Sequence, residues 1–223
     1  MDKKKITIIG IVCVIVALIV GITTCGKKKS DPANYVKVNL DLIFQGDVSQ
    51  AKEYINASTE ELENIYDTGI HVFVDTYLLG DMDVASAYTE TYDYLMKEIF
   101  AVMRYEVGEA KQIEKNIYEV SVRYQPVDVF TKFIPIIEEE SSKIQKALNS
   151  GVYGAKKEEA QISALQDYLN VAYEKLEMAY LELQYGAKEE VVMTVKVDND
   201  GNMEVLDNGI NQFIELILDL DNL

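Results

Sequence analysis

The sequence predicts an α+β fold that is mostly helical, with long helices packed on a small antiparallel sheet behind an N-terminal membrane-targeting segment. Three observations predict this class. Apolar residues recur at helical spacing over most of the chain after residue 35. Two stretches, 104–125 and 190–205, alternate apolar and polar side chains as strands do. The first 25 residues hold a nearly continuous apolar run that begins after a lysine triplet.

The part of the chain up to residue 102 predicts a series of helices. The first helix stops at Gly46, and Asp47 can then cap a short second helix that runs to Ile55. Ser58 and Glu61 match the capping-box pattern, which opens a helix over 58–79. After a break at Gly80-Asp81, another long helix is expected, with one apolar face made of Val84, Tyr88, Tyr92, Leu95, Ile99 and Val102.

From about residue 103 the apolar period changes from helical to alternating. The stretches "RYEVGEA" and "NIYEVSVRYQPVDVF" predict a pair of antiparallel strands, and Pro126 ends the second strand or places it at an edge. The stretch "EVVMTVKVDNDGNMEV" predicts a late hairpin, because Asp200-Gly201 suits a tight turn with positive φ. A C-terminal helix around Phe213 follows this hairpin.

Two further helices are expected between the two sets of strands. The first covers 131–148, and a glycine-rich turn separates it from the second, over 158–186, which Gly186 closes as a C-cap. The second helix carries a seam with 4-3-4-3-4 spacing that suits packing against another helix, within this chain or in a second copy. The seam residues are Leu165, Leu169, Ala172, Leu176, Ala179 and Leu183.

Composition and charge exclude several classes of protein. The chain has 223 residues, 48% hydrophobic and 26% charged, as in a packed globular domain. From residue 30 onward it holds 15 basic and 37 acidic residues, a net charge of −22 that argues against a nucleic-acid partner. This acidity either keeps the protein soluble or recruits a basic partner or loosely held cations.

Cysteine and histidine usage limits the possible chemistry. The two cysteines, Cys13 and Cys25, lie in or beside the N-terminal apolar segment, and His71 is the single histidine. The sequence therefore predicts no disulfide framework, no thiolate nucleophile, no cysteine- or histidine-based metal site and no cofactor in the body of the protein.

The N-terminal segment resembles a bacterial lipoprotein signal. Three lysines precede an apolar run over 6–22, and Ile22-Thr23-Thr24-Cys25 is similar to a lipobox, with Thr24 where that motif normally has Gly, Ala or Ser. The resemblance implies lipidation of Cys25. The same run is also long enough, at the lower limit of about 17–25 residues, to remain as a transmembrane span, and a secreted form is the third alternative. All three place the body outside the cytoplasmic membrane.

The chain is thus expected to contain three parts. Residues 1–25 form a lipoprotein signal or transmembrane anchor, 26–34 a polar tether, and 35–223 an extracytoplasmic α+β domain. The stretch "YVKVNLDLIFQGDVSQAKEYI" resembles the first helices of small cystatin-like, nuclear-transport-factor-two-like domains. The order of helices, strand pair and late hairpin from Ala33 to the end resembles a Gram-positive lipoprotein family of uncharacterised function. That likeness implies location and shape, and it carries no catalytic residues over to this chain.

Two motifs suggest catalysis or metal binding, but a structural role explains each of them better. His71 has no nucleophile elbow nearby, so we interpret it as a helix-surface histidine rather than a catalytic base. In "DNDGN", Gly201 stands at position 4 of a loop that begins at Asp198. A calcium-binding EF-hand loop needs its glycine at position 6, so a hairpin turn is the better interpretation.

Acidic and aromatic residues are also interpreted structurally. Asp81 and Asp83, with Glu90 and Asp93 nearby, suit a helix start, where acids favour the helix dipole. The run 138–140 is glutamate throughout and suits a solvated helix face. Fifteen tyrosines without a tryptophan are expected mainly to pack, and some could contact a sugar or peptide.

These observations predict a membrane-anchored extracytoplasmic lipoprotein that acts as a non-catalytic binding or interaction module of the cell envelope. Its partners are the membrane and a peptide, cell-wall or protein ligand, and its location is the outer face of the cell membrane, lipid-anchored or held by a single span. The alternative is a cell-envelope hydrolase that uses acidic residues in a cleft. A cleft lined by tyrosine and apolar residues would support the binding module, and two facing buried carboxylates would support the hydrolase.

Overall fold

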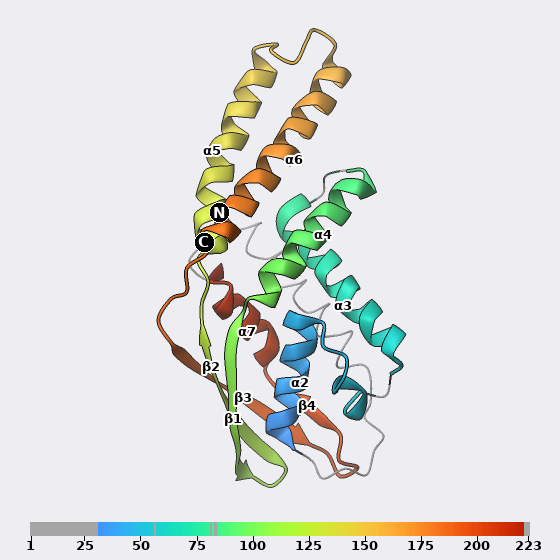
Figure 1. Ribbon diagram of the computed structural model, residues 1–223, viewed down its shortest axis with the longest axis vertical. Coiled ribbons are helices and arrows are strands. Elements are labelled where there is room, and N and C mark those ends of the chain that lie inside the picture. Colours follow the sequence, from blue (N-terminus) through green and yellow to red (C-terminus); the bar gives the residue numbers. More distant parts are fainter. Residues whose placement is uncertain (1–30, 56, 81, 83, 221–223) are drawn as a thin grey trace. The chain divides into compact units, whose positions relative to one another are not determined.

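The computed structural model describes residues 31–55, 57–80, 82 and 84–220, and it confirms a mostly helical α+β fold on a four-stranded antiparallel sheet (Figure 1). Cys25, with the predicted signal or anchor over 1–25 and most of the tether, lies outside the described residues. Among the helices that the structure describes, none combines the length and the apolar character that a membrane crossing requires.

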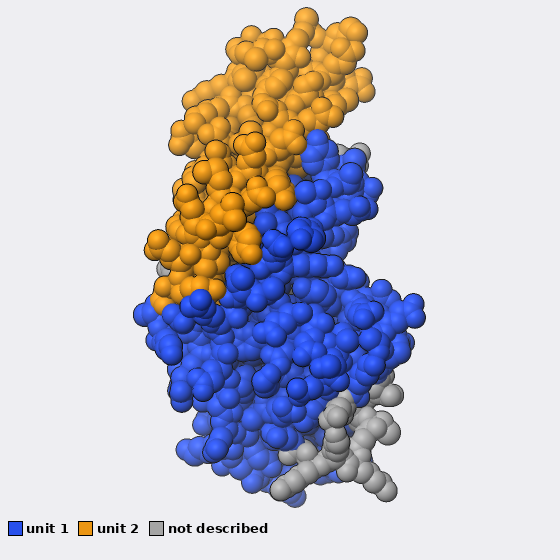
Figure 2. Space-filling view, viewed as in Figure 1, with its two compact units in different colours: residues 1–125, 187–215 blue, residues 126–186, 216–223 orange. Residues whose placement is uncertain are grey.

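The chain divides into two compact units, which Figure 2 shows in different colours. Unit 1 comprises residues 1–125 and 187–215, and unit 2 comprises 126–186 and 216–223. The chain therefore leaves unit 1 after the second strand, builds a helical insert, and returns for the third strand.

The helices of unit 1 follow the predicted order. Asp31 caps the first helix by accepting a hydrogen bond from the Asn34 backbone N–H (3.1 Å), and Gly46 ends it with a positive φ of 62°. The capping box is confirmed, because Ser58 and Glu61 exchange hydrogen bonds of 2.7 and 3.2 Å. The elements are α2 (Pro32–Gln45), the 3₁₀ helix η1 (Ala51–Glu53), α3 (Thr59–Val74), the π-helix η2 (Asp75–Leu79) and α4 (Ser86–Ala101).

The predicted short helix over 47–55 is wrong in its length. Only three residues, Ala51–Glu53, form a helical turn. Instead of capping a helix, the Asp47 carboxylate accepts a hydrogen bond from the Ser49 backbone N–H at 2.9 Å and closes a local turn. A short polar side chain that bonds to its own backbone two residues on competes with helix formation, which explains the difference.

The sheet of unit 1 has the strand order β1-β2-β3-β4, with every neighbouring pair antiparallel. Asn116 (φ 65°) turns the chain between the first two strands, and Gly201 (φ 89°) lies in the turn between the last two. Pro126 ends the second strand, as predicted. The strands are β1 (Arg104–Glu114), β2 (Ile117–Gln125), β3 (Glu189–Val197) and β4 (Met203–Val205).

The core of unit 1 is a cluster of aromatic rings between the helices and the sheet. Phe44 of α2 lies 5.5 Å from Phe100 of α4 and 6.0 Å from Phe213, measured between ring centroids, and Phe213 belongs to α7 (Gly209–Ile217). Phe213 also contacts Tyr124 of the sheet at 5.4 Å. These rings bury large apolar surfaces and dominate the stability of the unit.

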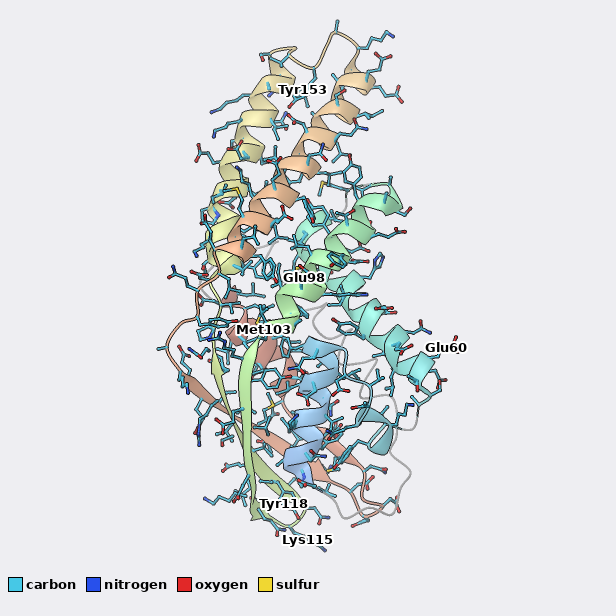
Figure 3. All side chains as sticks on the ribbon, viewed as in Figure 1. Glu60, Glu98, Met103, Lys115, Tyr118 and Tyr153 are labelled. Carbon is cyan, nitrogen blue, oxygen red and sulfur yellow. The ribbon has the colours of Figure 1, made fainter. Side chains whose placement is uncertain are left out.

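Unit 2 is built on an antiparallel pair of helices, α5 (Val129–Asn149) and α6 (Lys157–Leu181). Most of the predicted seam forms its packed face, since Leu176 is fully buried and Leu169, Ala172 and Ala179 are at most 5% exposed. Leu165 is only partly buried, and the predicted seam residue Leu183 lies beyond the end of the helix. The contact lies within this chain. At the connecting loop, which holds the labelled Tyr153 (Figure 3), the tyrosine hydroxyl donates a hydrogen bond to Asp167 of α6 at 2.5 Å.

The predicted role of Gly186 as the C-cap of this helix is wrong. The helix ends at Leu181, five residues earlier, and Gly186 donates its backbone N–H to the Pro126 carbonyl at 2.8 Å. A Cβ atom on this glycine would lie 2.8 Å from the Pro126 ring, so the glycine is explained by this close approach. The neighbouring bridge between Val127 and Tyr185 helps to close the base of the insert.

Candidate functional site

Unit 1 contains a small apolar pocket between α2, α3 and α4. The empty space around its lining is about 270 Å³ when the open solvent at its mouth is counted, and the enclosed part has room for about one water molecule. The described lining is apolar except for one tyrosine hydroxyl, and none of it is acidic: Leu42, Ile43, Ile65, Tyr66, Gly69, Ile70 and Phe100. A concave apolar surface with few polar groups is the usual form of a binding site for a small ligand or a side chain.

Local sequence explains why a pocket forms at this point. Gly69 lies in the third turn of α3 and is buried, but it has no side chain to fill the space that faces α2 and α4. Glycine in a helix interior costs about 1 kcal/mol relative to alanine. The pocket is therefore associated with a residue that weakens the helix that lines it.

Tyr66 forms the polar part of the pocket lining. Its ring packs against the C-cap of α2, where a side chain on Gly46 would lie only 2.8 Å from the ring. Burial raises the pKa of the Tyr66 hydroxyl, so it remains a neutral hydrogen-bond donor at physiological pH. Lys97 of α4 places its ammonium 5.6 Å from the centre of the same ring, within the range of a cation–π contact.

The same lysine joins α3 to α4. Its Nζ atom lies 2.7 Å from Asp67 Oδ1, so that the ring of Tyr66 and the carboxylate of Asp67 hold one ammonium group between them. Both charged side chains are partly exposed, at 38% for Lys97 and 59% for Asp67. We call Tyr66, Asp67 and Lys97 the cation seat.

His71 makes a second link between the two helices, one turn further along α3. Its Nδ1 atom lies 3.0 Å from Asp93 Oδ2 of α4, and its Nε2 atom lies 3.4 Å from Asp75 Oδ2. The hydrogen bond with Asp93 raises the pKa of His71. Burial raises the pKa of Asp93, whose Oδ1 atom is buried and has no hydrogen-bond partner among the described residues. The structure thus places His71 on a helix surface, with both ring nitrogens beside carboxylates.

A third polar group, Asp41 of α2, is buried but well satisfied. Its carboxylate accepts a hydrogen bond from the Tyr105 hydroxyl at 2.8 Å and pairs with Lys37 one helical turn before it. Burial, followed by the hydrogen bond to Asp41, raises the pKa of Tyr105 far above its ordinary value. With all partners supplied from within the fold, this group ties α2 to β1 and has a structural role.

The other acidic motifs that the structure describes make local hydrogen bonds and ion pairs. Asp198 accepts hydrogen bonds from the backbone N–H groups of Asp200 and Asn202, each at 2.8 Å, and so closes the predicted hairpin turn. Glu139 and Glu140 both pair with Lys143 on the exposed face of α5. Asp81 and Asp83 lie outside the described residues. Within the described ranges, no group of three or more His, Cys, Asp or Glu side chains is arranged to hold a metal ion.

Sequence reasoning did not find the pocket. Gly69 was visible as a weak point in a predicted helix, but the pocket also needs the ends of α2 and α4, which are distant in sequence. The signal that could have pointed to it is a glycine among apolar positions of an otherwise regular helix. Glycine at such a position lowers helix propensity by about 1 kcal/mol relative to alanine and leaves the space of a side chain empty.

Comparison with known proteins supports the fold. The chain matches no protein-family model and no curated protein sequence. It is similar to the crystal structure of a candidate lipoprotein, ycdA, from Bacillus subtilis, with a TM-score of 0.51 and 19% sequence identity. The match covers 85% of this chain and 56% of that one, so this chain spans little more than half the length of the protein it matches.

At this level of identity the likeness shows a shared fold. The neighbour comes from a Gram-positive bacterium and is described as a lipoprotein, as the sequence predicted for this chain. The comparison does not confirm the expected cystatin-like or nuclear-transport-factor-two-like domain, which stays a prediction.

Proposed function

We propose that the protein is a non-catalytic binding module of the bacterial cell envelope, and that the pocket of unit 1 is its binding site. The observation that carries this proposal is the described lining, in which apolar side chains and Tyr66 converge without a carboxylate. This composition suits recognition of an apolar side chain or small ligand. It offers no pair of acids for the hydrolysis of a glycosidic bond, so the binding module is favoured over the envelope hydrolase.

A direct test uses methyl NMR on the full chain in a non-ionic detergent. The probe is N-acetyl-leucinamide, which is neutral, and the control probe is N-acetyl-alaninamide. We expect the leucine probe to shift the methyl signals of Ile43, Ile65 and Ile70, because its isobutyl group can pack against the open mouth of the pocket. Methyl groups of α5 and α6 should stay unchanged. If the leucine probe moves none of the pocket methyl groups, the proposed function is wrong.

We further propose that the protein is lipid-anchored at Cys25, on the outer face of the cell membrane. Two observations support this: the lipobox-like Ile22-Thr23-Thr24-Cys25 after an apolar run, and a structural neighbour that is itself described as a lipoprotein. The anchor would place the binding module near the membrane surface.

Intact mass and metabolic lipid labelling of the native protein test the anchor. We expect a mature chain that begins at Cys25 with the mass of a diacylglyceryl group, and loss of the label in Cys25→Ala. A full-length, unlabelled chain that stays in the membrane in this variant would contradict lipidation and establish the 6–22 run as a span.

A further inference from the structure

The helices beside the pocket carry a strongly one-sided charge. Residues 58–101 hold ten acidic residues and one lysine, Lys97. On α3, the side chains of Glu60, Glu61, Glu63 and Asp67 are all exposed, and Figure 3 labels Glu60 near the start of this helix and Glu98 on α4. Such a surface attracts cations and repels anions over about one Debye length, roughly 8–10 Å at physiological salt.

The cation seat shows how this surface holds a positive group. One lysine of the protein already lies between the ring of Tyr66 and the carboxylate of Asp67. Because both Lys97 and Asp67 are partly exposed, water can compete for this ion pair, and its strength is modest. A cation from a partner could therefore replace the ammonium of Lys97 at small cost.

We infer that the pocket takes an apolar side chain from a cationic peptide segment, whose neighbouring lysine or arginine contacts Tyr66 and Asp67. This inference rests on the proposed function, and it adds the class of the ligand. The apolar side chain contacts the mouth of the pocket at Ile65 and Tyr66, the two lining residues that are not buried. The adjacent charge contacts Tyr66 and Asp67.

Charge disfavours other occupants. A second copy of this chain carries a net charge of −22 from residue 30 onward, and an anionic lipid or polymer would meet the same acidic helices. A cationic segment gains from both features of the site, because electrostatic complementarity increases the association rate and the apolar contact slows dissociation.

Three tripeptides, capped at both ends and titrated into the full chain, test the inference. We expect Lys-Leu-Lys to shift the methyl signals of Ile43, Ile65 and Ile70 and to bind about 10-fold more tightly than Glu-Leu-Glu at low salt, with the difference shrinking as NaCl is added. Lys-Ala-Lys should leave the pocket methyl groups unchanged. Equal affinity for the first two peptides would overturn the inference while leaving the pocket as a binding site. Failure of the neutral leucine probe would overturn both.

A variant of the cation seat gives a second, independent test. Lys97→Ala frees Tyr66 and Asp67, so we expect it to bind Lys-Leu-Lys about 3-fold more tightly, in line with a surface pair worth under 1 kcal/mol. Lys111→Ala is the matched control, because it removes the same charge from an exposed site on β1. If the two variants gain equally, the effect is one of overall charge, and the assignment of the partner's cation to the seat is wrong.

Discussion

The molecule contains two helix pairs that are held together in different ways. The α5–α6 pair packs through a regular seam of alanine and leucine. Its ion pairs are local: Lys143 pairs with Glu139 within α5, and the N-cap residue Lys156 pairs with Glu159 in the first turn of α6. The α3–α4 pair is linked across the helices by Lys97 with Asp67 and by His71 with Asp93. The α3–α4 pair also lines the apolar pocket.

This difference is the basis of our proposal that the α5–α6 pair is structural and that the α3–α4 pair borders the binding site. Small residues at α6 positions 160, 164, 172 and 179 fill the helix contact and bury it. In α3, a glycine leaves space that the surrounding side chains do not fill, and partly exposed ion pairs border it. Solvent-exposed ion pairs contribute little to stability, so they can be exchanged for contacts with a partner more easily than a buried seam can.

The largest expected effect comes from breaking the α5–α6 seam. Leu176→Ala should destabilise unit 2 by about 2–5 kcal/mol, because this fully buried side chain would leave a cavity. Hydrogen exchange measured by mass spectrometry should show lost protection over 129–181. Leu181→Ala is the control, since that side chain is 75% exposed and should have almost no effect. An equal effect of the two variants would contradict the structural role of the seam.

A smaller effect is expected from filling the pocket. Gly69→Ala should stabilise α3 by about 0.5–1 kcal/mol through helix propensity, and at the same time weaken binding of the leucine probe, because the new methyl group occupies the pocket. Urea unfolding and the methyl titration measure the two effects.

Thr68→Ala serves as the matched control on the exposed neighbour of Gly69. It should change helix propensity without changing probe affinity. If Gly69→Ala is strongly destabilising, the space beside Gly69 is not available to a methyl group, and the volume assigned to the pocket at this residue is wrong.

The smallest effect concerns pH and the second link between α3 and α4. Because the pKa of folded His71 lies above the unfolded value of about 6.5, its stabilising contribution is fully present below that pH and is lost as pH rises through the folded pKa. The raised pKa of Asp93 acts in the same direction but in a lower pH range, since ionisation of this partly buried acid opposes folding as pH rises above its ordinary value of 3.8. We expect stability to fall by less than about 1 kcal/mol across this range, because His71 is partly exposed.

His71→Gln should remove most of this dependence, and urea unfolding on either side of neutral pH measures it. As His71 is the single histidine, one imidazole signal in the NMR spectrum reports its pKa without ambiguity. A midpoint at or below that of an unstructured histidine would show that the contact with Asp93 does not favour the protonated ring.

Local patterns in the sequence predicted most of the fold. The capping box at Ser58, the end of the first helix at Gly46 and the hairpin at Gly201 each depend on residues close in sequence, and all three are confirmed. The sequence did not predict that η2 extends α3 as a π-helix, or that Asp47 closes a turn instead of capping a helix. Gly186 was misinterpreted because its packing partner, Pro126, lies 60 residues earlier in the chain.

The candidate site was less accessible to sequence reasoning than the fold. Its lining comes from three helices, and nothing in the local pattern brings Leu42, Tyr66 and Phe100 together. The acidic surface was visible, and its two interpretations, solubility and partner recruitment, both stay predictions, but the position of Lys97 on that surface was not predicted. Only the tertiary structure places that lysine over Tyr66 and beside Asp67.

The insert between β2 and β3 has a consequence for the order in which the chain folds. Tyr124 and Glu189, which pair across these two strands, are separated by 65 residues. During synthesis of the chain, β2 therefore cannot pair with β3 until the whole helical insert has been made. The helices α5 and α6 make local contacts that form quickly, and their packing draws Pro126 and Gly186 to within a hydrogen bond of each other. Once the insert is folded, the loop that must close to pair β3 with β2 is effectively shorter. We therefore expect the sheet of unit 1 to be completed late, at a rate that depends on the folding of unit 2.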